Sequence, residues 1–180
     1  MIYVFLANGF EETEAIAPID ILKRCEVEVA TVGIGGDQIT STHGVTVFTD
    51  MVESDVILSD EVDMIVLPGG MPGTLNLEKN ATVQEAIRFC AENNKYIGAI
   101  CAAPSILGKM NLLERKKATC FPGFGQFLYG AELGDEKVYV DGNIITAKGA
   151  GVAIEFGLAL AELIKGKGKS SAIRKSLQCM

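Results

Sequence analysis

The stretch YIGAICAAPSILG, residues 96–108, decides the fold. Its first five residues form an apolar run of the length of a buried strand, and Pro104 is well suited to the first turn of a helix. A strand that turns directly into a helix is the repeating unit of a parallel sheet covered by helices. Cys101 lies at this turn, flanked by alanine residues.

The same alternation runs outward along the chain. We expect strands at residues 2–7, 27–32, 62–67 and 96–100, and helices near residues 12–24, 82–92, 104–109 and 152–164. Near-continuous apolar strands separated by helices indicate an α/β fold, with a doubly wound, mostly parallel sheet and helices on both faces. Residues 38–50 and 137–147 are predicted to form hairpins, and Pro18 is expected to start or kink the first helix.

Length and charge limit the class of protein. The 180 residues are predicted to form one domain, residues 1–180. The formal net charge of -7 disfavours nucleic acid and anionic membrane as partners, because these bind clustered Lys and Arg. One basic run, KGKGKSSAIRK, is typical of a solvated helix end. The first apolar run is too short for a signal or membrane segment, so we expect a cytoplasmic protein.

The five cysteines are scattered and include no C-x-x-C pair, which favours reduced thiols over a disulfide framework. No metal site is expected, since His43 lies far in the sequence from any cysteine pair. Cys25, Cys90 and Cys120 are interpreted as small buried hydrophobic residues, and Cys179 as an exposed residue near the C-terminus.

Cys101 has the surroundings of a nucleophile. A nucleophile on a strand-to-helix turn needs small residues two positions before and after it, and Ala99 and Ala103 occupy these positions. Unpaired N–H groups at the start of a helix favour thiolate, so we expect the pKa of Cys101 to fall below its usual value of about 8.5. The alternative is a small buried hydrophobic residue, as most free cysteines are. Strand, small flanks and Pro104 together favour a functional cysteine.

The segment LPGGMPGT, residues 67–74, follows the third predicted strand. Its glycines permit backbone conformations in which N–H groups point at a neighbouring anion. With Cys101 as nucleophile, the N–H groups of Gly70 and Ala102 are candidates for an oxyanion hole. An ordinary glycine-rich loop explains the segment equally well. It is not a phosphate-binding Walker loop, because Gly-Lys-Ser/Thr is absent.

The segment NGFEETEA, residues 8–15, places three glutamates just past the first strand. A solvated, acidic helix start is the simpler explanation. The carboxyl ends of parallel strands meet at one edge of a sheet, so this segment, residues 67–74 and Cys101 are expected to converge there. A carboxyl group kept protonated by burial beside a thiolate would stabilise it by a hydrogen bond and pass a proton to a substrate.

A Cys-His dyad is the usual route to an activated cysteine, and this chain has one histidine, His43. It falls in a predicted hairpin far upstream of Cys101, where a turn or interface residue is favoured over a catalytic base. A papain-like or glutaminase triad is therefore disfavoured. Whether His43 approaches Cys101 in space stays open.

Four segments together resemble the ThiJ/PfpI superfamily, in its branch of the parkinsonism-associated protein deglycase. They are FLANGFEETEAIAPIDILKR, DMIVLPGGMPGTLNL, YIGAICAAPSILG and IITAKGAGVAIEFGLALAELI, and they occur in the expected order over nearly the whole chain. The resemblance implies a flavodoxin-like fold and a homodimer. By position in these motifs, Cys101 is similar to the reactive, oxidation-prone cysteine and Glu14 to its protonated glutamate partner, with Gly70 and Ala102 as the backbone donors.

Other positions around the implied site differ from many relatives. Phe121 stands where animal members commonly have a histidine, which argues against a His-assisted mechanism. Lys148 stands where an Arg or Gln is often found. Gly69, Phe121, Lys148 and His43 are candidates for lining the site.

The resemblance implies a cofactor-independent glyoxalase or deglycase. Cys101 would attack methylglyoxal, glyoxal or their adducts, and Glu14 would donate and accept protons. The alternative is an oxidative-stress sensor or redox-regulated chaperone, in which Cys101 is oxidised to sulfinic acid. Sequence does not separate the two, because a reactive thiol serves either purpose. Small reactive carbonyl compounds and a second copy of the chain are the expected partners, with no metal.

Overall fold

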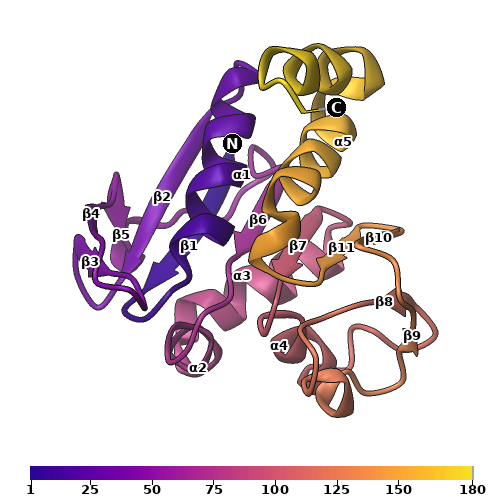
Figure 1. Ribbon diagram of the computed structural model, residues 1–180. Helices are drawn as coiled ribbons and strands as arrows, with labels where there is room; N and C mark the ends of the chain where they lie inside the picture. The colour runs from indigo at the N-terminus through magenta and orange to yellow at the C-terminus, as the bar shows by residue number, and fades with distance from the viewer. Residues whose placement is uncertain (180) are drawn as a thin grey trace.

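The computed structural model describes residues 1–179 and has a sheet of seven strands at its centre (Figure 1). These strands are β1 (Ile2–Ala7), β2 (Val29–Ile34), β5 (Met51–Val52), β6 (Met64–Leu67), β7 (Tyr96–Ile100), β10 (Val138–Asp141) and β11 (Ile144–Ala147). The α-helices are α1 (Glu12–Arg24), α2 (Gly73–Lys79), α3 (Ala81–Glu92), α4 (Pro104–Lys109) and α5 (Ala153–Ser176). Two small sheets pair β3 (Gln38–Thr40) with β4 (Thr46–Phe48), and β8 (Lys117–Ala118) with β9 (Glu132–Leu133).

The strand order is β10-β11-β7-β6-β1-β2-β5, and every neighbouring pair is parallel except β10 and β11. From β1 the chain proceeds to β2 on one side and later returns to β6 on the other side. The order therefore reverses between β1 and β6, and a doubly wound sheet binds its ligands at such a switch point. The predicted α/β, flavodoxin-like class is confirmed.

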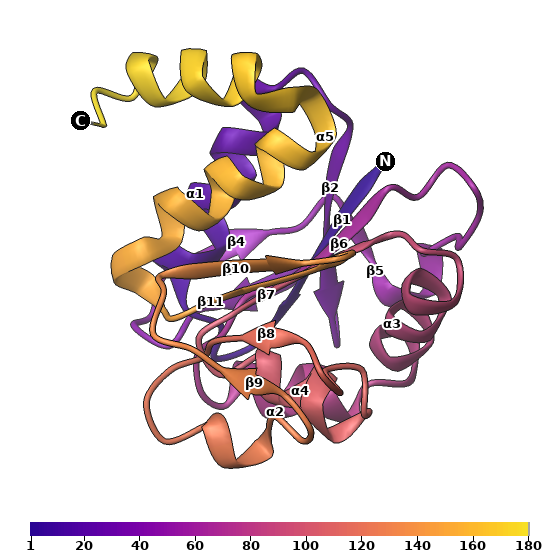
Figure 2. The same cartoon turned by 90° about the vertical axis from the view of Figure 1, so that its right-hand side faces the viewer.

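Strand β1 shows why the sheet is covered on both faces. Its alternate residues Tyr3, Phe5 and Ala7 enter one apolar cluster, and Ile2, Val4 and Leu6 enter the other. Side chains of a strand point alternately to opposite faces, so a strand of apolar residues needs a helical layer on each side. Figure 2 shows these layers, with α1 and α5 above the sheet and α2, α3 and α4 below it.

Helices α1 and α5 pack closely because Gly157 lies between them. A Cβ atom at Gly157 would lie 2.8 Å from the Ile21 Cδ1 atom and 3.0 Å from the Pro18 Cα atom. Pro18 lies inside α1 and does not start it, because the Glu11 side chain caps the helix earlier by accepting the Glu14 N–H at 2.7 Å.

Several predicted boundaries differ from the structure. Strand β6 begins two residues later than expected, because residues 62 and 63 bond to Ser59 and Met1 as part of a turn. The last helix continues past the predicted end at residue 164 to Ser176, across a non-helical Gly166 with φ 80°. Helix α2 was not predicted. Both hairpins are confirmed, as β3–β4 and β10–β11.

Within residues 1–179, no helix is both long enough and apolar enough to cross a membrane. All five cysteines are free thiols. Cys25 and Cys90 are buried as predicted, whereas Cys120 and Cys179 are partly exposed.

Candidate active site

Three segments meet at the carboxyl ends of the central strands, as the sequence predicts. Glu14 lies in the first turn of α1 after β1, Gly69 follows β6, and Cys101 follows β7. The Gly69 N–H donates to the Glu14 Oε2 atom at 2.9 Å, and the Glu11 N–H donates to the Gly69 carbonyl at 2.9 Å. These bonds fasten the start of α1 to the loop after β6, at the switch point of the sheet.

Cys101 occupies a backbone conformation that side chains other than glycine rarely adopt, with φ 64°. Two bonds hold it there: its N–H donates to the Ala147 carbonyl at 2.9 Å, and its carbonyl accepts the Phe121 N–H at 2.8 Å. Such a residue costs about 1 to 3 kcal/mol and persists where the surroundings fix it, often at functional sites. The turn leaves the thiol partly exposed, whereas Ala99 and Ala103 on either side are buried.

Glu14 is a buried acid, with only 1% of its surface exposed. Burial is the main cause that raises its pKa from 4.5 to about 7, and the charge of Glu11 adds to this. Hydrogen bonds with the Cys101 thiol and with the N–H groups of Gly69 and Ala150 oppose the rise. A carboxyl group in this state exchanges its proton near neutral pH, as a general acid or base requires.

The expected lowering of the Cys101 pKa was wrong. Burial, followed by the charge of Glu14, raises the pKa of the thiol to about 12. The N–H groups of Gly70 and Ala102 do lower the pKa, as predicted, but they are outweighed. Helix α4 begins only at Pro104, so Cys101 lies before the helix and not at its first turn.

Glu14 and Cys101 form a coupled pair of acids. Because the charge of Glu14 raises the pKa of the Cys101 thiol to about 12, whereas the pKa of Glu14 is about 7, the pair gives up its protons in two well-separated steps. Between these steps the pair holds one proton and one negative charge. These pKa values leave that proton on the sulfur, and its transfer to the Glu14 carboxylate creates a thiolate that faces a carboxylic acid and two backbone N–H groups.

The site leaves no room for side chains at its glycines. A Cβ atom at Gly69 would lie 2.6 Å from both the Cys101 Cβ and the Glu14 Oε2 atoms. Gly70 has φ 90°, and a Cβ atom there would lie 2.3 Å from the Glu11 nitrogen. Only glycine at these positions lets the β6 loop approach both acids, which explains the GG pair of the LPGG segment.

The sequence profile described as the DJ-1/PfpI family matches residues 1–163. The chain belongs to the DJ-1/PfpI family. This confirms the resemblance seen in the four sequence segments.

Relatives in this DJ-1/PfpI family match the chain over nearly all its length. Protein DJ-1 homolog B of Arabidopsis thaliana is 36% identical over 177 residues, 97% of this chain and 40% of that protein. The glutathione-independent glyoxalase DJ-1 of Schizosaccharomyces pombe is 32% identical over 184 residues, 97% of this chain and 96% of that protein. The solved structure of oxidized Toxoplasma gondii DJ-1 has a TM-score of 0.93 at 32% identity, covering 98% of this chain and 97% of that one.

The remaining candidates, Phe121, Lys148 and His43, lie in three different parts of the structure. Phe121 is tied to Cys101 through the backbone and is 48% exposed. Lys148 follows β11 and pairs with Asp135. His43 lies at the tip of the β3–β4 hairpin, where its Nδ1 atom is 2.9 Å from the Glu12 Oε1 atom and its side chain is 69% exposed.

Sequence reasoning missed Gly149 and Ala150 as site residues. The Ala150 N–H lowers the pKa of Glu14, and a Cβ atom at Gly149 would lie 3.6 Å from the Glu14 Oε1 atom and 3.9 Å from the Cys101 sulfur. The available signal was the KGAG run directly after the apolar IITA segment, a second glycine-rich loop at a strand end.

One group among the described residues has the spacing of metal ligands. Glu11, Glu12 and His43 offer ligand atoms within 4.8 Å of one another. The group joins the start of α1 to the β3–β4 hairpin and includes neither Cys101 nor Glu14. Glu12 is already paired with His43, so no step of chemistry at the thiol is assigned to this group.

Proposed function

We propose that this protein is a cysteine-dependent, cofactor-independent glyoxalase or deglycase that acts on methylglyoxal, glyoxal or their adducts. The observation that carries the proposal is the buried Glu14 carboxyl group beside Cys101 on its strained turn, where a Cβ atom at Gly69 would lie 2.6 Å from both the Glu14 Oε2 and the Cys101 Cβ atoms. The name of the Schizosaccharomyces pombe relative, a glutathione-independent glyoxalase, supports the same reaction class.

The first step is addition of the Cys101 thiolate to the aldehyde carbon of methylglyoxal. A C–S bond forms, the carbonyl π bond breaks, and the oxygen becomes an alkoxide. The N–H groups of Gly70 and Ala102, which already face the sulfur, stabilise the negative charge that moves to this oxygen. The Glu14 carboxyl group donates its proton to the alkoxide, giving a hemithioacetal and a carboxylate.

The second step is an internal redox rearrangement. The Glu14 carboxylate removes the proton from the former aldehyde carbon and returns it to the neighbouring carbon, while the hydroxyl proton of the hemithioacetal passes to the ketone oxygen on that neighbouring carbon. The first carbon is thereby oxidised to a thioester, and the second is reduced to an alcohol. A pKa of about 7 lets Glu14 give and take this proton near neutral pH.

Water completes the reaction. It adds to the thioester, the C–S bond breaks, and lactate leaves with the thiol regenerated. Glyoxal gives glycolate by the same route. Adducts of these aldehydes with amines or thiols enter the route because they are in equilibrium with the free aldehyde. The sum is one aldehyde and one water converted to one hydroxy acid, so no external oxidant or cofactor is consumed.

The test is methylglyoxal consumption with lactate detection in the parent protein, Cys101→Ala and Glu14→Gln. Turnover is expected in the parent and lost in both variants. Cys179→Ala removes a thiol near the C-terminus and is the matched control that keeps turnover. A parent protein without turnover above background, or a Cys101→Ala variant that retains it, would refute the proposal.

A second function uses the same residues. One similar solved structure is described as oxidized DJ-1, which favours an oxidative-stress sensor or redox-regulated chaperone as the alternative. Two molecules of peroxide would convert the Cys101 thiol to sulfinic acid and release two molecules of water. Peroxide titration with mass spectrometry tests this function. Oxidation that stops at a disulfide, or that shows no preference for Cys101, would exclude it.

The expected homodimer and cytoplasmic location stay predictions. Several large apolar side chains are exposed, among them Ile16 on α1 at 44% and Phe48 on β4 at 75%. Where such side chains form a contiguous patch, a partner commonly covers them. Light scattering on the purified protein measures its mass directly, and a monomer at micromolar concentration would contradict the dimer.

A further inference from the structure

A cavity of about 550 Å³ lies at the end of the sheet opposite to Cys101. Its lining includes Glu28 just before β2, Asp63 just before β6 and Tyr96 at the start of β7. Cys101 follows the other end of β7, and the five residues of this strand separate the two places by roughly 16 Å. Small-molecule sites have volumes of roughly 300 to 1,000 Å³, so this cavity is large enough for a ligand of its own.

The floor of this cavity is apolar. Its lining includes Val27, Tyr96, Leu163 and Ile164, which are partly buried against the apolar cluster on the α1–α5 side of the sheet. Leu163 and Ile164 belong to the turn of α5 just before its break at Gly166. Apolar side chains with a few polar groups around them are typical of a ligand site. A ligand with an aliphatic side chain fits this floor.

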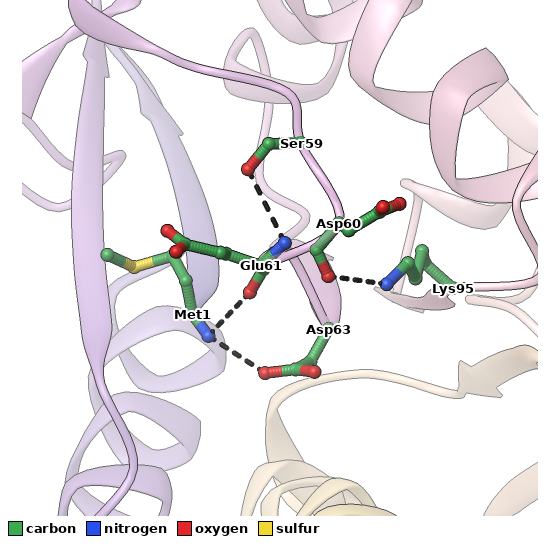
Figure 3. A network of polar contacts seen from close by, with 6 residues as sticks. All are labelled: Met1, Ser59, Asp60, Glu61, Asp63 and Lys95. Atoms are coloured by element: carbon green, nitrogen blue, oxygen red, sulfur yellow. Dashed lines mark hydrogen bonds and ion pairs between the residues drawn. The ribbon is translucent and has the colours of Figure 1, made fainter.

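Polar groups along one wall of the cavity already have partners in the protein, as Figure 3 shows. The Asp63 Oδ2 atom accepts from the Met1 amino group at 2.8 Å. The Lys95 Nζ atom donates to the Asp60 carbonyl at 2.7 Å. A ligand that used these groups would have to break such bonds first. We therefore expect a ligand to bind the charged groups of the cavity that have no partner.

Lys165 and Glu28 are two such groups, and their charges are opposite. Both line the cavity and are exposed to solvent. Within the described part of the chain, neither side chain takes part in an ion pair. Glu26, which also lines the cavity, is instead paired with Lys169 at 3.4 Å. The cavity therefore offers an ammonium group and a carboxylate group to a ligand that lies on its apolar floor.

We propose that this cavity binds a zwitterion with an apolar side chain, that is, a free α-amino acid such as leucine. Lys165 binds the carboxylate of the amino acid, Glu28 binds its ammonium group, and its side chain lies on Val27 and Leu163. A simple anion or cation leaves one of the two protein charges unpaired, and a zwitterion without a side chain leaves the floor uncovered. The lining therefore selects for all three features together. No covalent bond forms or breaks at this site.

The first test is titration of the isotope-labelled protein with L-leucine, followed by NMR of the backbone amides. Saturable shifts are expected around residues 26–28, 94–96 and 163–165, with a dissociation constant of about 0.1 to 10 mM for so small a ligand. The amides around Cys101 should stay unshifted. Shifts that do not saturate, or that centre on another part of the protein, would overturn the proposal.

Three analogues of leucine test its three features one at a time. 4-Methylpentanoate lacks the ammonium group, 3-methylbutylamine lacks the carboxylate, and glycine lacks the side chain. Loss of one charge should weaken binding at least about threefold, the effect of one exposed ion pair. Loss of the side chain should weaken it at least about tenfold, because the apolar floor stays in water. An analogue that binds as tightly as leucine would contradict the assigned zwitterion.

Charge variants assign each group of the ligand to its residue. Lys165→Gln should weaken binding of leucine and 4-methylpentanoate about three- to tenfold and leave that of 3-methylbutylamine unchanged. Glu28→Gln should weaken leucine and 3-methylbutylamine instead. Lys167→Gln and Glu162→Gln remove the same charges from exposed positions of α5 outside the cavity, and they are the matched controls. Equal weakening in cavity and control variants would show a general effect of charge and refute the site.

The amino acid site does not depend on the proposed reaction at Cys101. Cys101→Ala should bind leucine with the affinity of the parent protein, because the thiol lies at the other end of β7. The same variant tests the proposed function by its loss of turnover, so the two results are read separately. A Cys101→Ala variant that no longer binds leucine would place the amino acid at the thiol and overturn the distant site.

Discussion

Two regions of the protein each hold a thiol with a pKa raised to about 12, but the physical causes of the raised pKa differ between the two. In the interior of α3, burial alone raises the pKa of Cys90, and the charge of Lys95 opposes it. At the turn after β7, burial is joined by the charge of Glu14 and opposed by two backbone N–H groups. Burial keeps the Cys90 thiol protonated near neutral pH, and no neighbouring acid is among the causes. At Cys101, a proton moved onto Glu14 removes one of the causes, so the reactivity of this thiol is adjustable.

The largest expected effect is the difference in turnover between variants that lack Cys101 and variants that lack Cys90. Cys101→Ala removes the nucleophile and should lower methylglyoxal turnover by a factor of about 1000 or more. Cys90→Ala should leave turnover near the parent value and lower the free energy of unfolding by about 1 to 2 kcal/mol, because it opens a small cavity in the core. Lactate assays and urea unfolding measure both effects. Equal loss of activity in the two variants would show that packing, not chemistry, explains Cys101.

The pH dependence of stability gives the next effect. The pKa of Glu14 is raised from 4.5 to about 7 in the folded protein, so its protonated form is favoured by folding. This contribution is complete below pH 4.5 and is lost as the pH rises through about 7, for a total of about 3 kcal/mol. Glu14→Gln should remove it.

Urea unfolding of the parent protein and of Glu14→Gln at pH values from 4.5 to 8 isolates the contribution of Glu14 to the free energy of unfolding. The difference between their free energies of unfolding should decrease steadily with rising pH, while contributions from other acids cancel. A difference that stays constant over the range would show that Glu14 titrates at its ordinary pKa and is not held protonated beside Cys101.

The glycine between the two acids tests how tightly the site is built. A Cβ atom at Gly69 would collide with Cys101 and Glu14, so Gly69→Ala should lower the free energy of unfolding by about 1 to 3 kcal/mol and turnover by at least about tenfold. Gly168→Ala in α5 is the matched control, because no atom lies within 4 Å of its Cβ position. A Gly69→Ala variant as active and stable as the control would contradict the close contacts of Gly69 with Cys101 and Glu14.

The sequence predicted the location of the site because the ends of the strands can be recognised from short segments of sequence. Apolar runs bounded by turn residues marked β1, β6 and β7, and the carboxyl ends of such strands must meet at one edge. Cys101 followed from this rule, whereas the choice of Glu14 among three neighbouring glutamates came from the family resemblance. The structure supplies the physical reason: Glu14 is 1% exposed, whereas Glu11 accepts the Glu14 N–H as the cap of α1.

The missed features depend on contacts between distant segments. The pKa of Cys101 was mispredicted because burial, followed by the charge of Glu14 87 positions earlier in the chain, outweighs the local N–H groups. Gly149 joins the site because β11 pairs with β7, and its glycine-rich run marks a loop at a strand end but does not predict this pairing. The last helix was predicted to end at residue 164, close to the non-helical Gly166, and the missed feature is the continuation of the helix to Ser176.

The smallest expected effect concerns the single histidine and asks whether Glu14 works without an imidazole. His43 is 69% exposed and bonded to Glu12, so His43→Ala should keep turnover within about twofold of the parent value. A histidine acting as general base contributes about a hundredfold or more. Steady-state assays with methylglyoxal distinguish these magnitudes. A hundredfold loss would place the imidazole in the reaction and return Cys101 to the class of His-activated thiols, whereas retained turnover leaves the carboxyl group of Glu14 as the proton carrier of the site.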